Sequence, residues 1–595
     1  MFERLSDSQR QIVDCPDKRI VVKACPGSGK TFSVTARFAR LLSDNNLNRH
    51  QGIAIISFTN TACEEIRKNL PKFGVANIGY PHYIGTIDSF INNYIFLPFG
   101  HLIMGCNKRP DIVGTEYNPW FNYDSRQTSK IKVKIKDKYI DKIVRRDPNY
   151  YFDKVSFDLS GMPFPIMPPT SYHFSWKELT KKDGSLMANI QSIIEMKNQH
   201  FNNGVANQAD ANYIAYKILT KYPKIAQNIA QKFPILIIDE AQDTTTIQMS
   251  IIDILDKAKT DSILLMGDPF QAIFEWNTAD PSLFMAKYNN ETWTPLELLE
   301  NRRSSNNICQ VNNGFFSHNM ISVSEEDRDY PIKPDIIGHS TQSDSINQIK
   351  DNFIAECQKL GFNEENYAIV YRGRKFGETH FGLINEYRFD NDEIPWLSGN
   401  YFVRDLVHGK YLIDNGVYKA GLTLIERGFF KLQEGQAYIS TIYIKNKVTE
   451  IGFRHFRKIV FEFIKRLPDT NCTLIQWVDS AKNSGLNFSV NRDRANVGIP
   501  NLFHEEKLTV AEAPKYLKTI HSVKGMTLEA ICVFLSKKDV SNYATLLRQE
   551  YNNLTSEGKE QMRIVYVACT RPKKLLWIAV PNEDVNIWRN KLLAQ

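Results

Sequence analysis

The sequence predicts an α/β protein with two cores built on parallel β-sheets, each core carrying an inserted, mainly helical accessory subdomain. Short apolar runs bounded by polar or glycine-containing turns recur along the chain, as expected for strands buried on both faces of a sheet. Helical patterns at residues 28–42 and 60–70 follow two of these runs, and strand-then-helix order is typical of parallel sheets. The runs occupy residues 20–23, 53–58, 235–238 and 263–266, and then 367–371, 531–535 and 575–580.

Two long stretches interrupt the apolar runs, and their composition differs from that of the segments with predicted strands. We interpret these stretches as the inserts. A length of 595 residues agrees with about four domains of roughly 150 residues each. We expect the first core at residues 1–97 and 230–290 with an insert at 98–229, and the second core at 291–378 and 506–595 with an insert at 379–505. Residues 130–138, KIKVKIKDK, would place lysines on one strand face, where they could contact duplex phosphates or protect an exposed sheet edge.

Composition narrows the class of protein without defining its function. The apolar share of 42% and the charged share of 24% are ordinary for a globular protein, and the net charge of +8 permits a polyanionic partner without requiring one. The nine cysteines form no CxxC pair, which argues against zinc-ribbon, iron–sulfur and thioredoxin-like sites. The sequence shows no signal segment and no run of about 18 apolar residues, so we expect a cytoplasmic protein with no membrane span.

Residues 20–31, IVVKACPGSGKT, carry the first chemical signal: a buried strand, a glycine-rich turn and then a helix. Such a turn lets backbone N–H groups surround phosphate oxygens at a helix N-terminus. Lys30 would reach the β- and γ-phosphates of a nucleotide, and Thr31 would give a hydroxyl ligand to Mg²⁺. The first glycine of the general pattern is replaced here by alanine. The expected nucleotide contacts of the turn are Ala24, Cys25, Pro26, Gly27, Ser28 and Gly29.

An acidic segment, DEAQD at residues 239–243, directly follows the apolar run at 235–238. At the carboxyl end of a parallel strand, Asp239 can hold Mg²⁺ while Glu240 orients and deprotonates the attacking water. Two adjacent acids could also be a solvated turn, but the strand before them and the phosphate-binding turn favour a site. Together the two segments predict an ATP-hydrolysing protein.

With these two segments, seven further motifs in order make the chain resemble the UvrD-like helicases of superfamily one, the group of UvrD, PcrA and Rep. The resemblance implies two RecA-like cores and a DNA substrate, either single-stranded or a tailed duplex. The motifs are LSDSQ at 5–9, SFTNTACEEI at 57–66, GTIDSF at 85–90, GDPFQAIFEW at 267–276, NRRS at 301–304, TIHSVKG at 519–525 and YVACTR at 566–571.

The resemblance also implies roles for individual residues. Gln9 would read adenine and Gln271 would sense the γ-phosphate, while Arg303 and Arg571 would act as arginine fingers when the cores close on ATP. Aromatic side chains would stack on bases of the single strand, and polar ones would contact its phosphates. The expected DNA contacts are Phe58, Thr59, Asn60, Phe274, Trp276 and His521.

Three positions depart from the family pattern. Phe32 follows the loop threonine where relatives often carry arginine, and Arg302 stands where relatives carry the tyrosine of NYRS. In relatives these two planar side chains lie on either side of adenine, so here the pair could be kept with its two members exchanged. Packing of Phe32 against the protein is the equally weighted alternative. Asp88 stands where histidine is common, which predicts a lost or altered DNA contact. The acid that usually reads the ribose is displaced by two places to Glu529.

Two functions remain open at this point. The first is a motor that moves 3′ to 5′ on single-stranded DNA by hydrolysing ATP. The second is a DNA- or nucleotide-sensing regulatory ATPase that controls a partner and unwinds little. Only 24 residues follow Arg571, so we expect no fused nuclease. In this respect the chain resembles stand-alone UvrD-like subunits of bacterial antiphage systems, such as the Gabija helicase subunit beside an OLD-family nuclease. RNA as a substrate and a purely structural role are less favoured.

Overall fold

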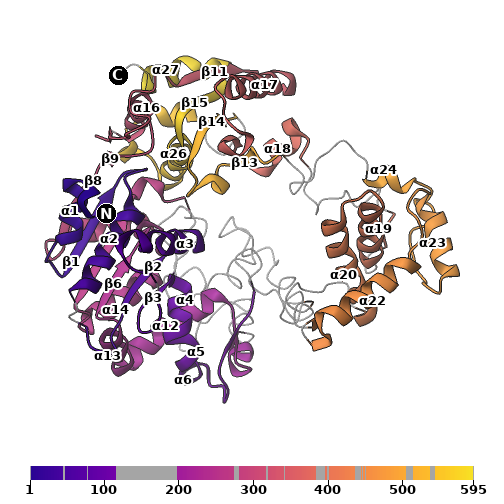
Figure 1. Cartoon of the computed structure of the whole chain (residues 1–595), viewed down its shortest axis with the longest axis horizontal. Helices are drawn as coiled ribbons and strands as arrows, with labels where there is room; N and C mark the ends of the chain where they lie inside the picture. The colour runs from indigo at the N-terminus through magenta and orange to yellow at the C-terminus, as the bar shows by residue number, and fades with distance from the viewer. Residues whose placement is uncertain are drawn as a thin grey trace, which may run out of the picture. The chain divides into compact units, whose positions relative to one another are not determined.

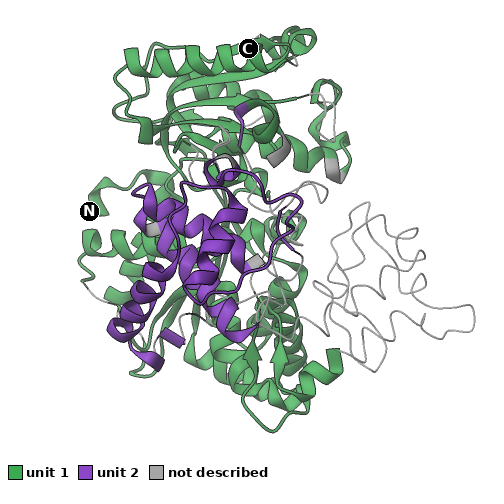
Figure 2. Ribbon diagram, turned by 90° about the vertical axis from the view of Figure 1, so that its right-hand side faces the viewer, with its two compact units in different colours: residues 1–119, 126–380, 514–595 green, residues 120–125, 381–513 purple. Residues whose placement is uncertain are grey.

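The computed structural model separates the chain into two compact units, residues 1–119, 126–380 and 514–595 in the first and residues 120–125 and 381–513 in the second (Figures 1 and 2). The structure describes residues 2–44, 47–76, 78–114, 197–273, 280–316, 319–340, 342–383, 395–397, 401–435, 444, 447–448, 450–503, 514–536 and 543–593. Residues 130–138 lie outside this set. Among the described residues, no helix is long and apolar enough to cross a membrane.

Within the described residues, the first sheet has six parallel strands in the order β3-β2-β6-β7-β1-β8. The sequence predicted the four central strands, and they are almost wholly buried. The strands are β1 (Arg19–Ala24), β2 (Ile53–Ser57), β3 (Tyr83–Thr86), β6 (Ile235–Ile238), β7 (Ser262–Gly267) and β8 (Thr294–Leu298).

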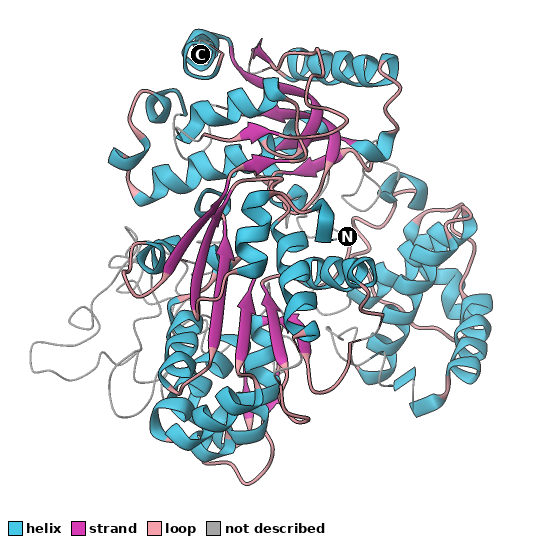
Figure 3. Ribbon diagram, turned by 60° about the vertical axis from the view of Figure 1, so that its left-hand side comes forward, coloured by secondary structure: helices cyan, strands magenta, loops and turns pink. Residues whose placement is uncertain are grey.

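Helices cover both faces of this sheet because successive side chains of a buried strand point to opposite sides. Val21 and Leu265 face one apolar layer, and Ile20 and Leu264 face the other. The first layer comes from α12 (Gln208–Lys221), α13 (Pro223–Lys232) and α14 (Thr246–Lys257); the second comes from α1 (Asp7–Asp14), α2 (Lys30–Ser43) and α3 (Asn60–Asn69). Figure 3 shows the helices flanking the strands. Parallel strands buried on both faces are typical of α/β cores.

The second sheet lies in the same compact unit and is also parallel. Its described strands have the order β11-β15-β14-β12-β13, with bounds Asp335–His339, Pro572–Pro581, Leu528–Phe534, Tyr367–Tyr371 and Leu517–Thr519. One face packs on α16 (Asn306–Phe316), α26 (Ser556–Cys569) and α27 (Val585–Leu592). On α17 (Ser343–Lys359), the Phe353 ring lies 5.4 Å from that of Trp577. Two parallel α/β cores are therefore present, as the sequence predicted.

The second compact unit is helical in its described part. Its apolar core includes the fully buried Trp477, whose ring stacks on Phe488 with centroids 5.5 Å apart. The buried carboxylate of Asp405 accepts hydrogen bonds from Arg427 and Lys431, which compensates for the loss of its hydration. The helices are α19 (Tyr401–Asp414), α20 (Tyr418–Glu434), α22 (Phe453–Arg466), α23 (Leu474–Asn483) and α24 (Ile499–Phe503).

Candidate functional site

The glycine-rich turn joins β1 to α2 and is shaped as the sequence predicted. Gly27 and Gly29 have φ angles of 69° and 80°, in the left-handed region that favours glycine. The hydroxyl of Ser28 donates to the carbonyl oxygen of Cys25 at 2.8 Å and closes the turn. Lys30 and Thr31 then begin α2, and the N–H groups in the first turn of a helix have no partner within the helix, so they can bind an anion.

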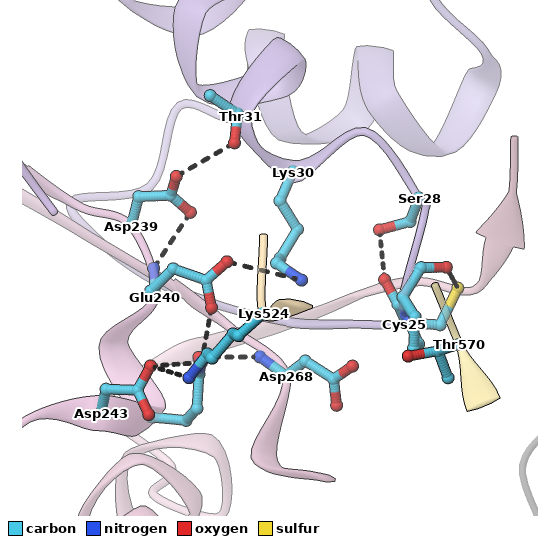
Figure 4. Close-up of polar contacts among 12 residues, drawn as sticks. Cys25, Ser28, Lys30, Thr31, Asp239, Glu240, Asp243, Asp268, Lys524 and Thr570 are labelled. Carbon is cyan, nitrogen blue, oxygen red and sulfur yellow. Dashed lines mark hydrogen bonds and ion pairs between the residues drawn. The ribbon is translucent and has the colours of Figure 1, made fainter. Parts of the chain in front are cut away.

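The two acids lie opposite the loop, at the carboxyl end of β6 (Figure 4). The ammonium of Lys30 is 3.9 Å from the carboxylate of Glu240, and the hydroxyl of Thr31 donates to Asp239 at 3.3 Å. Glu240 has a φ of 56°, a strained value for a residue with a side chain. Its backbone N–H donates to the Asp239 carboxylate at 3.0 Å, which helps to hold that conformation.

Burial sets the electrostatics of this acidic cluster. Burial, and then the charge of Glu240, raise the pKa of Asp239 above its ordinary value. Burial also raises the pKa of Asp268, which follows β7, to about 6. Burial also tends to raise the pKa of Glu240. The charge of Lys30, with other nearby positive charges and a hydrogen bond from Gln242, outweighs burial, so the pKa of Glu240 is lowered. Glu240 is therefore ionised at neutral pH, while Asp239 lies where a cation would favour its charged form.

The residues present suit Mg²⁺. Thr31 and Asp239 offer a hydroxyl and a carboxylate oxygen side by side, and hard oxygen ligands are those that Mg²⁺ prefers. In nucleotide sites this ion takes few protein ligands, because phosphates and waters fill the remaining positions. A bound cation would also offset the cost of burying the Asp239 carboxylate, which is 1% exposed as a residue.

The second core contributes two arginines beside the same loop, the buried Arg571 and the partly buried Arg303. Arg571 is 2% exposed and donates to the carbonyl of Val567 and the hydroxyl of Thr570, both at 2.9 Å. Arg303 donates to the carbonyl of Thr570 at 3.1 Å. Within the described part of the chain, neither guanidinium has a carboxylate within 4.0 Å. Burial lowers the pKa of both, and each arginine's neighbourhood would be completed by an anion.

Close backbone contacts hold the arginine segment against the loop. The side-chain amide of Asn301 donates to the carbonyl of Pro26 at 2.9 Å, and the N–H of Arg302 donates to that of Gly27 at 2.9 Å. A Cβ atom on Gly27 would lie only 2.7 Å from the Cβ of Arg303. Only glycine fits this position without displacing the segment.

The residues expected around adenine gather near Gly29. A Cβ atom there would lie within 4 Å of Gln9, Phe32 and Arg302. Gln9 is 1% exposed, forms a capping box with Ser6 and lies 3.5 Å from the carbonyl of Ser28. Phe32 is partly buried against the ring of Phe73, at 5.0 Å, as the packing alternative requires. The guanidinium of Arg302 pairs with the adjacent strand residue Glu300 at 3.1 Å.

Gln271 lies in a short 3-10 helix, Pro269–Gln271, and is 4% exposed. Its side-chain nitrogen has no hydrogen-bond partner among the described residues. A buried amide donor without a partner costs free energy, and a phosphate oxygen would satisfy it. Glu529, by contrast, is already engaged, because Lys573 and Lys574 each approach its carboxylate to 2.9 Å.

Four of the expected DNA contacts are described. Phe58 and Thr59 follow β2 and are partly buried, and the Thr59 hydroxyl caps α3 by accepting from the N–H of Ala62 at 3.2 Å. Asn60 and His521 are exposed, the latter in the 3-10 helix His521–Val523. The expected contacts Phe274 and Trp276 lie outside the described residues.

Asp88, the departure from the usual histidine, has a structural role. Its carboxylate accepts hydrogen bonds from the side-chain amides of Asn212 on α12 at 3.0 Å and of Gln248 on α14 at 2.9 Å. The acid therefore ties the helical layer of the first core to the segment that follows β3. Histidine could not accept both of these bonds in the same way.

Sequence reasoning missed one part of the site. Lys524, in the TIHSVKG segment, forms an ion pair of 2.6 Å with Asp243, the last acid of DEAQD. Gln242, between the paired acids and Asp243, links several of these groups through its side-chain amide. Both residues stood within recognised motifs, but a motif does not show which partner a side chain meets.

A phosphate-binding loop on one parallel-sheet core, with two arginines of a second such core beside it, is typical of a two-core nucleotide-dependent protein. Comparison with protein families agrees: the UvrD/REP helicase N-terminal domain matches residues 5–292, and the UvrD-like helicase C-terminal domain matches residues 501–583. The chain belongs to the UvrD-like helicase family.

The sequence identity to individual members of the family is low, and the alignments cover only part of each chain. The chain is 25% identical over 394 residues to DNA helicase II of Haemophilus influenzae, covering 62% of this chain and 49% of the relative. It is 25% identical over 424 residues to ATP-dependent DNA helicase Rep of Buchnera aphidicola, covering 69% and 60%. It is 31% identical over 288 residues to an ATP-dependent helicase/nuclease subunit of Natranaerobius thermophilus, covering 42% and 22%. The chain thus spans about half the length of the curated DNA helicase II and Rep relatives that it matches.

Proposed function

We propose that this protein is an ATP-driven DNA translocase and helicase that moves 3′ to 5′ on single-stranded DNA. The observation that carries the proposal is the pair of guanidiniums, of the partly buried Arg303 and the buried Arg571, that lie on the second core beside the phosphate loop of the first. A nucleotide γ-phosphate would supply the missing anion. Its loss on hydrolysis would weaken the hold of one core on the other, which is how hydrolysis becomes motion.

The proposed chemistry follows from the contacts of the site. Lys30, Arg303 and Arg571 stabilise the charge on the transferred phosphoryl group, and Gln271 senses the γ-phosphate. Glu240, whose pKa is lowered, accepts a proton from the attacking water. Thr31 and Asp239 would hold Mg²⁺, which would neutralise negative charge on the nucleotide phosphates.

Recognition of the adenine of ATP is proposed for residues near Gly29. Gln9 reads adenine, and Phe32 and Arg302 lie on its two faces, a hypothesis supported by their common proximity to Gly29. Glu529 is the candidate for ribose contact. Its two lysine partners favour weak ribose recognition, because breaking a hydrogen-bonded ion pair would oppose the contact.

The proposed DNA track crosses both cores. Phe58, Phe274 and Trp276 stack on bases, Thr59 and Asn60 contact phosphates, and His521 is a further DNA contact. Stacking tolerates any base sequence, as a translocase requires. For the domain division we propose residues 1–97, 208–290 and 294–298 for the first core, because β8 pairs with β1 and the helices α12 and α13 pack on the first sheet; this moves the expected boundaries at 229/230 and 290/291. The second core keeps residues 299–378 and 506–595, and the compact helical unit at residues 381–513 supports the insert at 379–505.

A second candidate is a regulatory ATPase that controls a partner nuclease and unwinds little alone. The observation in its favour is the similarity to a relative whose name describes a helicase/nuclease subunit. An OLD-family nuclease in an antiphage system, or another repair protein, is the partner class that this candidate implies.

The two candidates are separated by strand separation on matched substrates. We expect the purified chain with ATP and Mg²⁺ to unwind a duplex with a 3′ single-stranded tail, and to leave a 5′-tailed duplex of the same sequence intact. Lys30→Ala should abolish the activity, whereas Lys359→Ala, at an exposed ion pair on α17, should preserve it. Unwinding from the 5′ tail would refute the direction. Hydrolysis without any unwinding would favour the regulatory ATPase.

A further inference from the structure

The helix α22 of the compact helical unit has one buried side and one side that faces solvent (Figure 1). The buried side packs into the apolar core of the unit and has the spacing of one helical face, with Phe456, Val460 and Phe463. We name the solvent side the α22 surface. It is defined by five exposed residues, which are Phe453, Arg454, Lys458, Phe461 and Lys465.

The α22 surface is strongly basic. Five basic residues and one acidic residue give α22 a formal net charge of +4, half of the +8 of the whole chain. Among the described residues, no carboxylate lies within 4.0 Å of Arg454 or Lys458. Lys465 pairs with Glu462 at 2.9 Å, but both side chains are at least 60% exposed, and an exposed pair contributes little. The positive charge of this helix is therefore largely uncompensated within the protein.

Two large apolar side chains lie among these charges. Phe453 is 63% exposed and Phe461 is 51% exposed, and the two residues are eight positions apart on the same helix. Removing such rings from water is favourable, and aromatic residues and arginine are enriched where proteins bind one another. The combination fits a partner that offers apolar side chains flanked by carboxylates.

The detailed contacts favour a protein over a nucleic-acid strand. The guanidinium of Arg457 lies 5.2 Å from the centre of the Phe453 ring and pairs with Glu426 of α20 at 3.0 Å. One face of the ring is thereby covered, whereas stacking on a base needs an open face. The carboxylates of Glu426 and Glu462 would repel phosphates, but a protein can match charges of both signs.

The same charges argue against a second copy of this chain as the partner. Two α22 surfaces brought together would place cation against cation, and like charges in an interface cost free energy. An acidic partner gains from each of these cations.

We propose that the α22 surface docks an acidic amphipathic helix of a partner protein. The two phenylalanines pack on the apolar side of that helix, and the three cations face its carboxylates. A helix fits because Arg454, Lys458, Phe461 and Lys465 have the spacing i, i+4, i+7 and i+11, which forms a straight row along α22. The inference does not depend on the proposed function, because the residues of ATP hydrolysis lie in the other compact unit.

The test measures the binding of synthetic peptides to the full chain by fluorescence anisotropy at low salt. The probe is a fluorescent peptide whose helix carries leucines along one side and glutamates beside them. A scrambled peptide of the same composition keeps the charge and loses the apolar side. We expect the unaltered protein to bind the amphipathic peptide at least about tenfold more tightly than the scrambled one.

Two variants place the binding on α22. Lys458→Glu reverses one charge of the α22 surface and Phe461→Ser removes one ring, and each should weaken binding of the amphipathic peptide at least about tenfold. The matched controls are Lys482→Glu, at an exposed lysine of α23, and Tyr80→Ser, at a ring of the first unit that is 74% exposed. Both controls should bind within about twofold of the unaltered protein. An unchanged midpoint of thermal unfolding shows that each variant is folded.

Four results would overturn the proposal. The first is no binding of the amphipathic peptide below about 1 mM, and the second is equal binding of the scrambled peptide, because charge alone would then explain the affinity. The third is a loss of affinity for an oligonucleotide, in both α22 variants, as large as the loss for the peptide; the surface would then belong to nucleic acid. The fourth is a dimer in analytical ultracentrifugation that Phe461→Ser converts to monomer, which would make a second copy the occupant.

Discussion

Substitution of Gly27 by alanine tests the fit between the phosphate loop and the arginine segment. An alanine at a φ of 69° costs about 1–2 kcal/mol, because its Cβ approaches the following carbonyl oxygen. The larger effect is the displacement of the arginine segment, residues 301–304. The new Cβ would lie 2.7 Å from the Cβ of Arg303, whereas carbon atoms pack at about 3.5–4.0 Å. Residues 301–304 must therefore move by roughly 1 Å, and a displacement of that size can lower a rate about 100-fold.

Gly74→Ala is the matched control for this prediction. Gly74 has a φ of 83°, and no described atom would lie within 4 Å of an added Cβ, so the backbone strain is similar and the displacement is absent. Steady-state ATP hydrolysis with saturating single-stranded DNA should be about 100-fold slower for Gly27→Ala and nearly unchanged for Gly74→Ala. Equal rates for the two variants would refute the reasoning.

Three further predictions concern neighbouring groups. Phe32→Ala should raise the KM for ATP about fivefold through loss of aromatic contact, and an equal rise in Phe73→Ala would favour simple packing instead. Asp88→Ala should lower the free energy of unfolding in urea by about 1.5–3 kcal/mol, and a change within the error of the urea titration would contradict the role assigned to its two hydrogen bonds. The affinity for Mg²⁺, measured in the presence of a non-hydrolysable ATP analogue, should weaken as the pH falls from about 8 to about 6, because protonation of Asp239 competes with binding of the ion. If Asp239→Asn shows the same pH dependence, another group causes it.

The strands that the sequence predicted are the central ones, and those that it missed are the edges. β1, β2, β6 and β7 in the first sheet, like β12, β14 and β15 in the second, are covered on both sides and read as continuous apolar runs. The edge strands β3, β8, β11 and β13 are only partly buried, so polar and apolar residues mix within them. Their place in the sheet depends on a neighbour distant in sequence, which local pattern cannot supply.

The site divides in the same way. The phosphate loop and the paired acids are local features whose backbone geometry, including both positive φ values of the loop, is dictated by the glycines and the strand ends. Contacts between motifs are not local. The pairing of Lys524 with Asp243 spans 281 positions, and the two lysines that engage Glu529 come from the adjacent strand β15. These contacts depend on the way the sheets assemble, and a motif spelling does not contain that information.

The measurement that tests the central claim most directly is steady-state ATP hydrolysis by the unaltered protein and by Arg571→Ala, each with and without single-stranded DNA. Arg589→Ala, at a half-exposed guanidinium on the same core, is the matched control. If the second core completes the site, DNA should stimulate the unaltered protein and the control, and Arg571→Ala should lose at least about 1000-fold in kcat. An Arg571→Ala variant that hydrolyses ATP as fast as the control would contradict the two-core site.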